Sequence, residues 1–84
     1  MPGEAFDGAS TRVDFAAFCE SRYDDLRRAF AGASYLGLKP EDILHDTMML
    51  ARRHHRRFAA EDELFAWCVT VGVRKMRKQS RRKR

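Results

Sequence analysis

Hydrophobic side chains recur every three or four positions along most of the chain, and apolar and polar residues nowhere alternate over a sustained stretch. The first spacing places apolar residues on one face of a helix, whereas strict alternation is typical of a half-buried strand. Three helices are predicted, at about residues 12–33, 40–57 and 62–79. The pattern therefore predicts an all-α fold, a compact three-helix bundle.

The first predicted helix is bounded by recognisable start and stop residues. Ser10 or Thr11 is expected to cap its start with a side-chain oxygen. Gly37 suits the left-handed residue that ends a helix. The apolar residues expected in the core are those at helical spacing in this segment and those beside Gly37: Phe15, Phe18, Cys19, Tyr23, Leu26, Phe30, Tyr35, Leu36 and Leu38.

The middle helix has two contrasting faces. Pro40 suits a first helical position, and Glu41 and Asp42 follow in the first turn, where carboxylates are favoured. One face is expected to be buried or half-buried, through Ile43, Leu44, Thr47, Met48, Ala51, His55 and Phe58. The opposite face is charged, through Asp42, His45, Asp46, Arg52, Arg53 and Arg56, with Met49 at its centre. An apolar residue ringed by charges is typical of an interface anchor with a polar rim. The alternative is a solvated face with one exposed methionine.

The last helix begins with Glu61, Asp62 and Glu63. Its expected buried residues are Leu64, Trp67, Cys68 and Val71. Phe65 lies off that face, so it is either an exposed ring on which bases of single-stranded DNA can stack or an aromatic residue at the edge of the core.

Charge is unevenly distributed over the 84 residues, a length that suits one small domain. All twelve acidic residues lie at or before Glu63, and eight of the seventeen basic residues lie after position 73. Residues 1–73 therefore carry nine basic residues, a net charge of −3, and residues 74–84 carry +8. This asymmetry predicts binding to nucleic acid or another acidic surface. A solvated basic tail is the alternative.

No constellation of residues indicates catalysis or metal binding. The chain has neither a nucleophile elbow nor a Gly-rich phosphate loop. His54 and His55 are adjacent and so point to different helix faces, and Cys19 and Cys68 do not form a CxxC motif. We therefore expect a protein that is not an enzyme, without cofactor or metal. Two reduced thiols and the lack of a signal peptide or an apolar membrane span predict a cytoplasmic location.

The middle and last helices also carry a family resemblance. The run PEDILHDTMMLARRH at 40–54 resembles region 2.2 of the extracytoplasmic-function (ECF) branch of bacterial sigma-70-type sigma factors. The common run of that family is (Ala/Pro)-Glu-Asp-Leu-Val-Gln-Glu-Thr-Phe-Leu-Arg-Ala-Trp-Arg. Phe58, a short loop and LFAWC at 64–68 resemble the second motif, a Phe, a loop and Phe-x-Ala-Trp-Leu. A basic helix follows in both.

The resemblance implies a sigma region 2-like domain over residues 11–79, between a flexible N-terminus at 1–10 and a basic tail at 80–84. In the family, the charged face docks on the clamp helices of the RNA polymerase β′ subunit. The positions that match, or lie on, this face are Asp42, His45, Asp46, Met49, Arg52 and Arg53. The connector and last helix bind the melted promoter −10 element, which implicates Arg56, Arg57, Phe65, Arg74, Lys75, Arg77, Lys78, Arg81 and Arg82.

The function implied by the resemblance is that of a transcription factor which acts on bacterial RNA polymerase at promoter −10 DNA. No segment corresponds to the region 4 helix-turn-helix, so we expect a separate region 4-type protein as partner; an anti-sigma factor is another expected partner. Two alternatives stay open. One is a sigma mimic that inhibits the polymerase, and the other is a small basic DNA-binding bundle with no polymerase partner.

Overall fold

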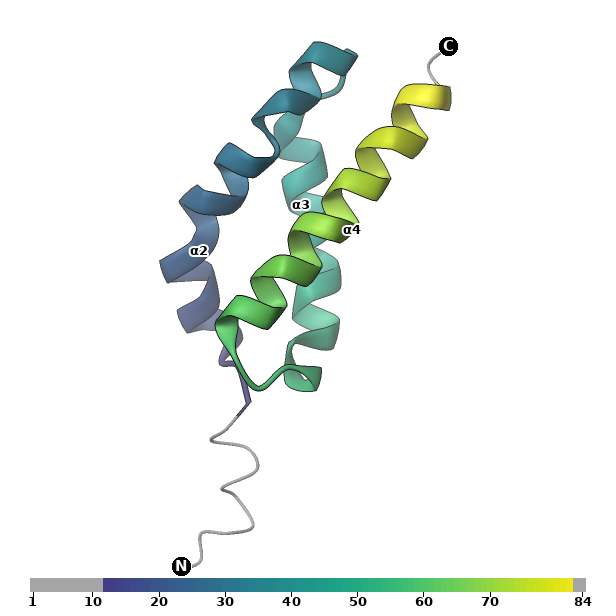
Figure 1. The fold of residues 1–84 in the computed structure, drawn as a ribbon. Coiled ribbons are helices and arrows are strands. Elements are labelled where there is room, and N and C mark those ends of the chain that lie inside the picture. The colour runs from purple at the N-terminus through teal and green to yellow at the C-terminus, as the bar shows by residue number, and fades with distance from the viewer. Residues whose placement is uncertain (1–11, 83–84) are drawn as a thin grey trace, which may run out of the picture.

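A computed structural model describes residues 12–82, without the side chain of Arg82. Its elements in chain order are α2 (Phe15–Ala29), the 3-10 helix η1 (Ala31–Leu36), α3 (Pro40–His54), the 3-10 helix η2 (His55–Arg57) and α4 (Glu61–Arg82). Each α-helix contacts the other two. α2 and α4 run in the same direction and α3 runs in the opposite one (Figure 1). The predicted all-α, three-helix architecture is confirmed, with no strand between residues 12 and 82.

The ends of the first helix differ from the prediction. The Asp14 carboxylate accepts a hydrogen bond from the Ala16 N–H at 3.1 Å, so Asp14 caps α2, and not Ser10 or Thr11. The helix ends at Ala29 rather than at Ala33, because the backbone there changes to i→i+3 hydrogen bonds, such as Ala33 N–H to the Phe30 carbonyl at 3.0 Å. The expected flexible segment at 1–10 lies outside the described residues, as do Lys83 and Arg84.

The turn between α2 and α3 exposes two residues that were expected in the core. Tyr35 is 92% exposed and Leu36 is 44% exposed, whereas Leu38 is buried as predicted. The 3-10 helix has three residues per turn and directs Ala33 inward, which leaves the next side chains facing out. Gly37 ends this segment with φ +76°, the predicted left-handed conformation.

The core lies where the three helices meet. Thr47 is the only polar residue among the buried side chains of the described chain. Trp67 and Val71 are half-buried rather than buried. The fully buried large side chains are Phe18, Leu26, Phe30, Ile43, Thr47, Leu64 and Cys68.

Gly72 allows α4 to approach the end of α2. A Cβ atom added at Gly72 would lie 2.2 Å from two atoms of the Phe30 ring, and that ring is fully buried. Glycine inside a helix costs about 1 kcal/mol relative to alanine. At this position it is required by the close contact between backbone and ring.

The start of α2 is tied to the connector between α3 and α4. The Val13 N–H donates to the Phe58 carbonyl at 3.1 Å, and His55 Nδ1–H donates to the Val13 carbonyl at 2.7 Å. The Phe58 and Trp67 rings pack with centroids 5.6 Å apart. α3 ends at His54 rather than at the predicted residue 57. The next three residues, His55 to Arg57, form a 3-10 turn that leads into the connector.

Candidate functional site

The outer face of α3 is solvent-exposed, as its pattern predicts. Met49 is 51% exposed and lies among charged side chains. Asp46 is half-buried, and the other predicted docking residues, Asp42, His45, Arg52 and Arg53, are exposed. The N-terminal end of this face is acidic and its C-terminal end is basic, so each end has the sign that stabilises its end of the helix.

Met49 is also part of an apolar groove between α2 and α3. The groove has a volume of about 420 Å³. Tyr23, expected in the core, is 46% exposed and lines this groove instead. The lining residues are Phe15, Cys19, Tyr23, Glu41, Leu44, His45, Met48, Met49 and Arg52. The apolar face of α3 thus continues onto α2, and the groove has room for apolar side chains of a partner.

The contribution of α2 to this groove was missed in the sequence pattern. Phe15, Cys19 and Tyr23 are spaced by four residues, a row on one side of a helix. This spacing was interpreted as core. A large aromatic residue at the edge of an apolar face can lie either in the core or in a surface groove. Only the packing of α3 against α2 decides between these two places.

Burial disfavours the thiolate form of both cysteines. Both are free thiols, with Cys68 buried and Cys19 half-buried, in agreement with the prediction of reduced cysteines. Burial raises the pKa of the Cys68 thiol to about 12, and the nearby Cys19 adds to that rise. Burial also raises the pKa of the Cys19 thiol. Because the thiolate is the reactive form, burial lowers the reactivity of both side chains.

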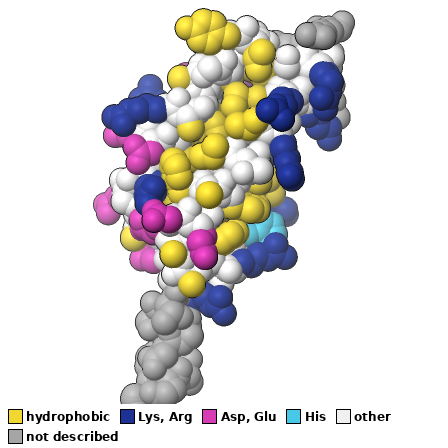
Figure 2. Space-filling model, in the orientation of Figure 1, with side chains coloured by type: hydrophobic (Ala, Val, Ile, Leu, Met, Phe, Trp, Pro, Cys, Tyr) yellow, Lys and Arg dark blue, Asp and Glu magenta, His cyan; other side chains and the backbone are white. Residues whose placement is uncertain are grey.

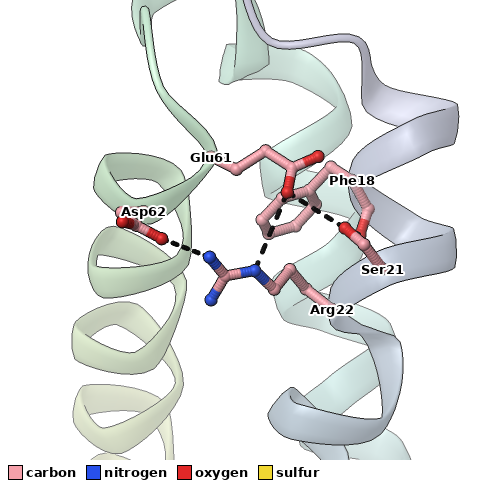
Figure 3. Close-up of polar contacts among 5 residues, drawn as sticks. All are labelled: Phe18, Ser21, Arg22, Glu61 and Asp62. Atoms are coloured by element: carbon pink, nitrogen blue, oxygen red, sulfur yellow. Dashed lines mark hydrogen bonds and ion pairs between the residues drawn. The ribbon is translucent and has the colours of Figure 1, made fainter.

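Phe65 lies at the edge of the core, with one face covered by a cation. The Arg22 guanidinium carbon lies 4.9 Å from the centroid of the ring. Arg22 also pairs with Asp62, and its Nε lies 3.7 Å from Glu61 Oε1 (Figure 3). The Ser21 hydroxyl donates to the same Glu61 oxygen at 3.0 Å. The Phe65 ring is therefore half-buried, and Arg22 covers one of its faces.

The same cluster changes the charge of the connector. Glu61 and Asp62 stand in the first turn of α4, where carboxylates are stabilised by the helix N-terminus. Their pairing with Arg22 offsets part of the negative charge that the sequence places beside the connector. Arg22 comes from α2, and its role is not visible in the local sequence of the connector.

The predicted DNA-binding cations form two groups. Arg56 and Arg57 are exposed in η2, at the end of the molecule where α3 leads into α4. The second group lies along the other half of α4, towards the C-terminus (Figures 1 and 2). It comprises Arg74, Arg77, Lys78 and Arg81, which are exposed, and Lys75, which is half-buried; the Arg82 side chain lies outside the described part.

The remaining histidines are engaged in packing. The His54 and Trp67 rings meet in a T-shaped contact with centroids 5.7 Å apart, and His55 is bonded to the Val13 carbonyl. Within residues 12–82, no three His, Cys, Asp or Glu side chains gather as a metal site would require. No described helix combines the length and hydrophobicity needed to cross a membrane.

Comparison of the chain with protein-family models, with curated proteins and with solved structures found no match.

Proposed function

We propose that this chain is a transcription factor that resembles sigma region 2. In this proposal it docks on the clamp helices of bacterial RNA polymerase and contacts promoter −10 DNA, with a separate region 4-type protein as partner. The observation that carries the proposal is the outer face of α3. There Met49, half-exposed at the rim of an apolar groove, stands among Asp42, Asp46 and Arg52.

An apolar anchor beside a groove and inside a charged rim suits binding to another protein. Residues at the centre of an interface supply most of the binding energy, and the surrounding polar groups exclude water and set orientation. Clamp helices form a coiled coil, whose side chains project in ridges. The groove between α2 and α3 offers a depression into which such a side chain fits.

The DNA part of the proposal rests on the basic half of α4. Arg74, Arg77, Lys78 and Arg81 are exposed on one helix and supply cations that can pair with phosphates. Stacking of a base on Phe65 requires Arg22 to leave the ring. A displaced Arg22 would then be available to a phosphate.

A second candidate, a sigma mimic that occupies the clamp helices and inhibits transcription, is favoured by the Arg22 cluster. It covers Phe65 and fixes the start of α4 to α2, and both features oppose reading of a melted base. This candidate uses the same docking face, so the two differ only in what happens at the DNA.

Docking is tested by binding of the full chain to core RNA polymerase and to an isolated β′ clamp-helix fragment. Asp46→Arg combined with Met49→Ala should weaken binding by at least ~30-fold, because truncated central anchors typically cost about 2 kcal/mol or more. The control is Tyr35→Ala, which removes a large and even more exposed side chain from a different part of the surface. Undiminished binding by the double variant, with unchanged helical content by circular dichroism, would reject the proposed face.

Run-off transcription separates the two candidates. Core polymerase with this chain alone should give no specific transcript from a linear promoter, because Phe65 and the basic helix must offset unpairing at roughly 1.4 kcal/mol per base step. Addition of a co-purifying region 4-type protein restores initiation if the chain is a transcription factor. A mimic instead lowers the transcripts of a resident sigma factor. Promoter-specific transcription by core enzyme and this chain alone contradicts both.

A further inference from the structure

A second apolar surface lies on the side of the molecule away from the proposed docking face. Phe65, Val69 and Val73 are spaced by four residues on α4 and are packed against the core, yet all three remain partly exposed. The contact of Phe65 with Arg22 places this row beside α2. We call these three residues the α4 stripe. Figure 2 shows a band of hydrophobic side chains across this face.

The band extends to the end of the bundle where α2 finishes. Leu36, 44% exposed, lies in η1, which contacts α4. Isolated apolar residues on a surface are ordinary, whereas a continuous band marks an interaction surface. The groove between α2 and α3 is separate from it, because its lining includes no residue of α4.

Charge along this face runs from acidic to basic. α2 and α4 point in the same direction (Figure 1), so their N-terminal ends lie together. α4 begins with Glu61, Asp62 and Glu63, and its C-terminal half carries Arg77 and Arg81. α2 is capped by Asp14, and its last turn holds Arg27 and Arg28. On α2 these two arginines are balanced by Asp24 and Asp25, so the acidic-to-basic polarity of this face comes from α4.

We infer that the occupant of the α4 stripe is a second copy of this chain, bound antiparallel about a two-fold axis. A two-fold interface uses the same patch on both subunits, so the patch must complement itself. An antiparallel copy places the basic half of each α4 opposite the acidic start of the other. Asp62 and Arg77 are about 22 Å apart along the helix axis. A two-fold axis midway between them passes near Val69. It brings Arg77 of one copy to Asp62 of the other, whose exposed carboxylate also pairs with Arg22 of its own chain.

Other arrangements complement this face less well. A parallel copy sets Arg77 against Arg77 and acid against acid. A nucleic acid is attracted to the basic half but not to the other end of the stripe, where three carboxylates of the first turn of α4 outnumber the cation of Arg22. The inference does not depend on polymerase docking, which uses α3. It does use Phe65 and Arg77, which are also DNA contacts of the proposed function, so dimerisation and DNA binding compete for this face.

Sedimentation equilibrium of the full chain tests the inference. The average mass should rise from the 9.8 kDa of one chain towards twice that value as concentration increases. The range from ~1 µM to ~1 mM covers dissociation constants typical of weak and moderate homodimers. Added salt should weaken association without abolishing it, because charge pairs are screened and the apolar stripe is not. A mass of one chain over the whole range at low salt would overturn the inference.

Two pairs of variants assign the face. Val69→Glu should raise the dimer dissociation constant at least ~tenfold, since it buries a charge at the centre of the interface. Thr70→Glu, at the next and exposed position, should leave it unchanged. Because Val69→Glu can also unfold the chain, Arg77→Glu is paired with Lys78→Glu. Lys78 is also exposed, and the same charge change there lies on the side of α4 opposite Val69, since nine residues turn a helix by about 180°. Weakening by Arg77→Glu alone supports the arrangement, whereas equal effects of the two substitutions, or none, reject it.

Discussion

Among the described glycines, Gly72 is the one with no room for a side chain. The Phe30 ring that it faces is fully buried and cannot swing into solvent. Gly72→Ala should therefore lower the free energy of unfolding by about 1–3 kcal/mol, although alanine is the better helix former. Urea denaturation followed by circular dichroism measures this change.

The matched control is Gly32→Ala in η1. A Cβ atom at Gly32 has no neighbour within 4 Å, so this variant should be as stable as the original chain or slightly more stable. Combining Gly72→Ala with Phe30→Leu should cost less than the two single changes together, because the smaller side chain makes room. Equal stability of Gly72→Ala and the original chain would contradict the close contact.

Thr47 is buried with an unpaired hydroxyl. Thr47 lies on α3 with its side chain fully buried, and its Oγ1 has no hydrogen-bond partner. Burying such a hydroxyl costs about 1–3 kcal/mol, and valine has the same shape without it. Thr47→Val should therefore raise the free energy of unfolding by about 1 kcal/mol. Thr47→Ser, which keeps the hydroxyl and loses the methyl group, should lower it. A valine variant less stable than the serine variant would be inconsistent with an unpaired hydroxyl.

At the scale of the elements, the Arg22 cluster joins α2 to the first turn of α4. Arg22 is 24% exposed and contacts the carboxylates of Glu61 and Asp62 and the face of Phe65. Partly exposed ion pairs contribute up to about 1 kcal/mol each, and a cation over a ring contributes a similar amount. Arg22→Ala should lower the free energy of unfolding by about 1–2 kcal/mol, with a smaller loss at high salt.

Arg28→Ala is the control for that prediction. Arg28 pairs with Asp25 at 3.4 Å within one helix, and its side chain is 78% exposed, so its removal should change stability by less than ~0.5 kcal/mol. Thermal unfolding at low and high salt compares the two variants. If both have the same small effect, the cluster does not hold the two helices together.

At the scale of the whole molecule, the separation of charge predicts how the chain binds nucleic acid. The last eleven residues carry eight positive charges and no acid. Affinity for single-stranded DNA should fall steeply with salt, because each phosphate contact releases counterions at a slope of about −0.7. Removal of residues 80–84 takes away four cations and should flatten the slope of log affinity against log salt by up to ~3.

Fluorescence anisotropy with a labelled oligonucleotide measures that slope. Arg52→Ala combined with Arg53→Ala removes two cations from the outer face of α3 and should leave the slope nearly unchanged. Salt-independent binding by the full chain would show that the basic half of α4 does not contact phosphates.

The sequence alone determined the helices and their faces. Spacing of three and four residues identified all three α-helices, and the unusual conformational preferences of Pro40 and Gly37 marked a start and a stop. Both signals are local: they depend on residues within one or two turns, so they survive without knowledge of the rest of the chain. The exposed charged face of α3 followed from the same periodicity.

Only the tertiary structure decided where the edges of those faces lie. Tyr23, Phe65 and Leu36 all carry apolar side chains near a helix edge, yet one lines a groove, one lies beneath Arg22 and one is exposed. Periodicity assigns a direction to each side chain but does not say which neighbour, if any, covers it. That depends on how closely two helices approach, which at Gly72 is set by the absence of a single carbon atom next to Phe30.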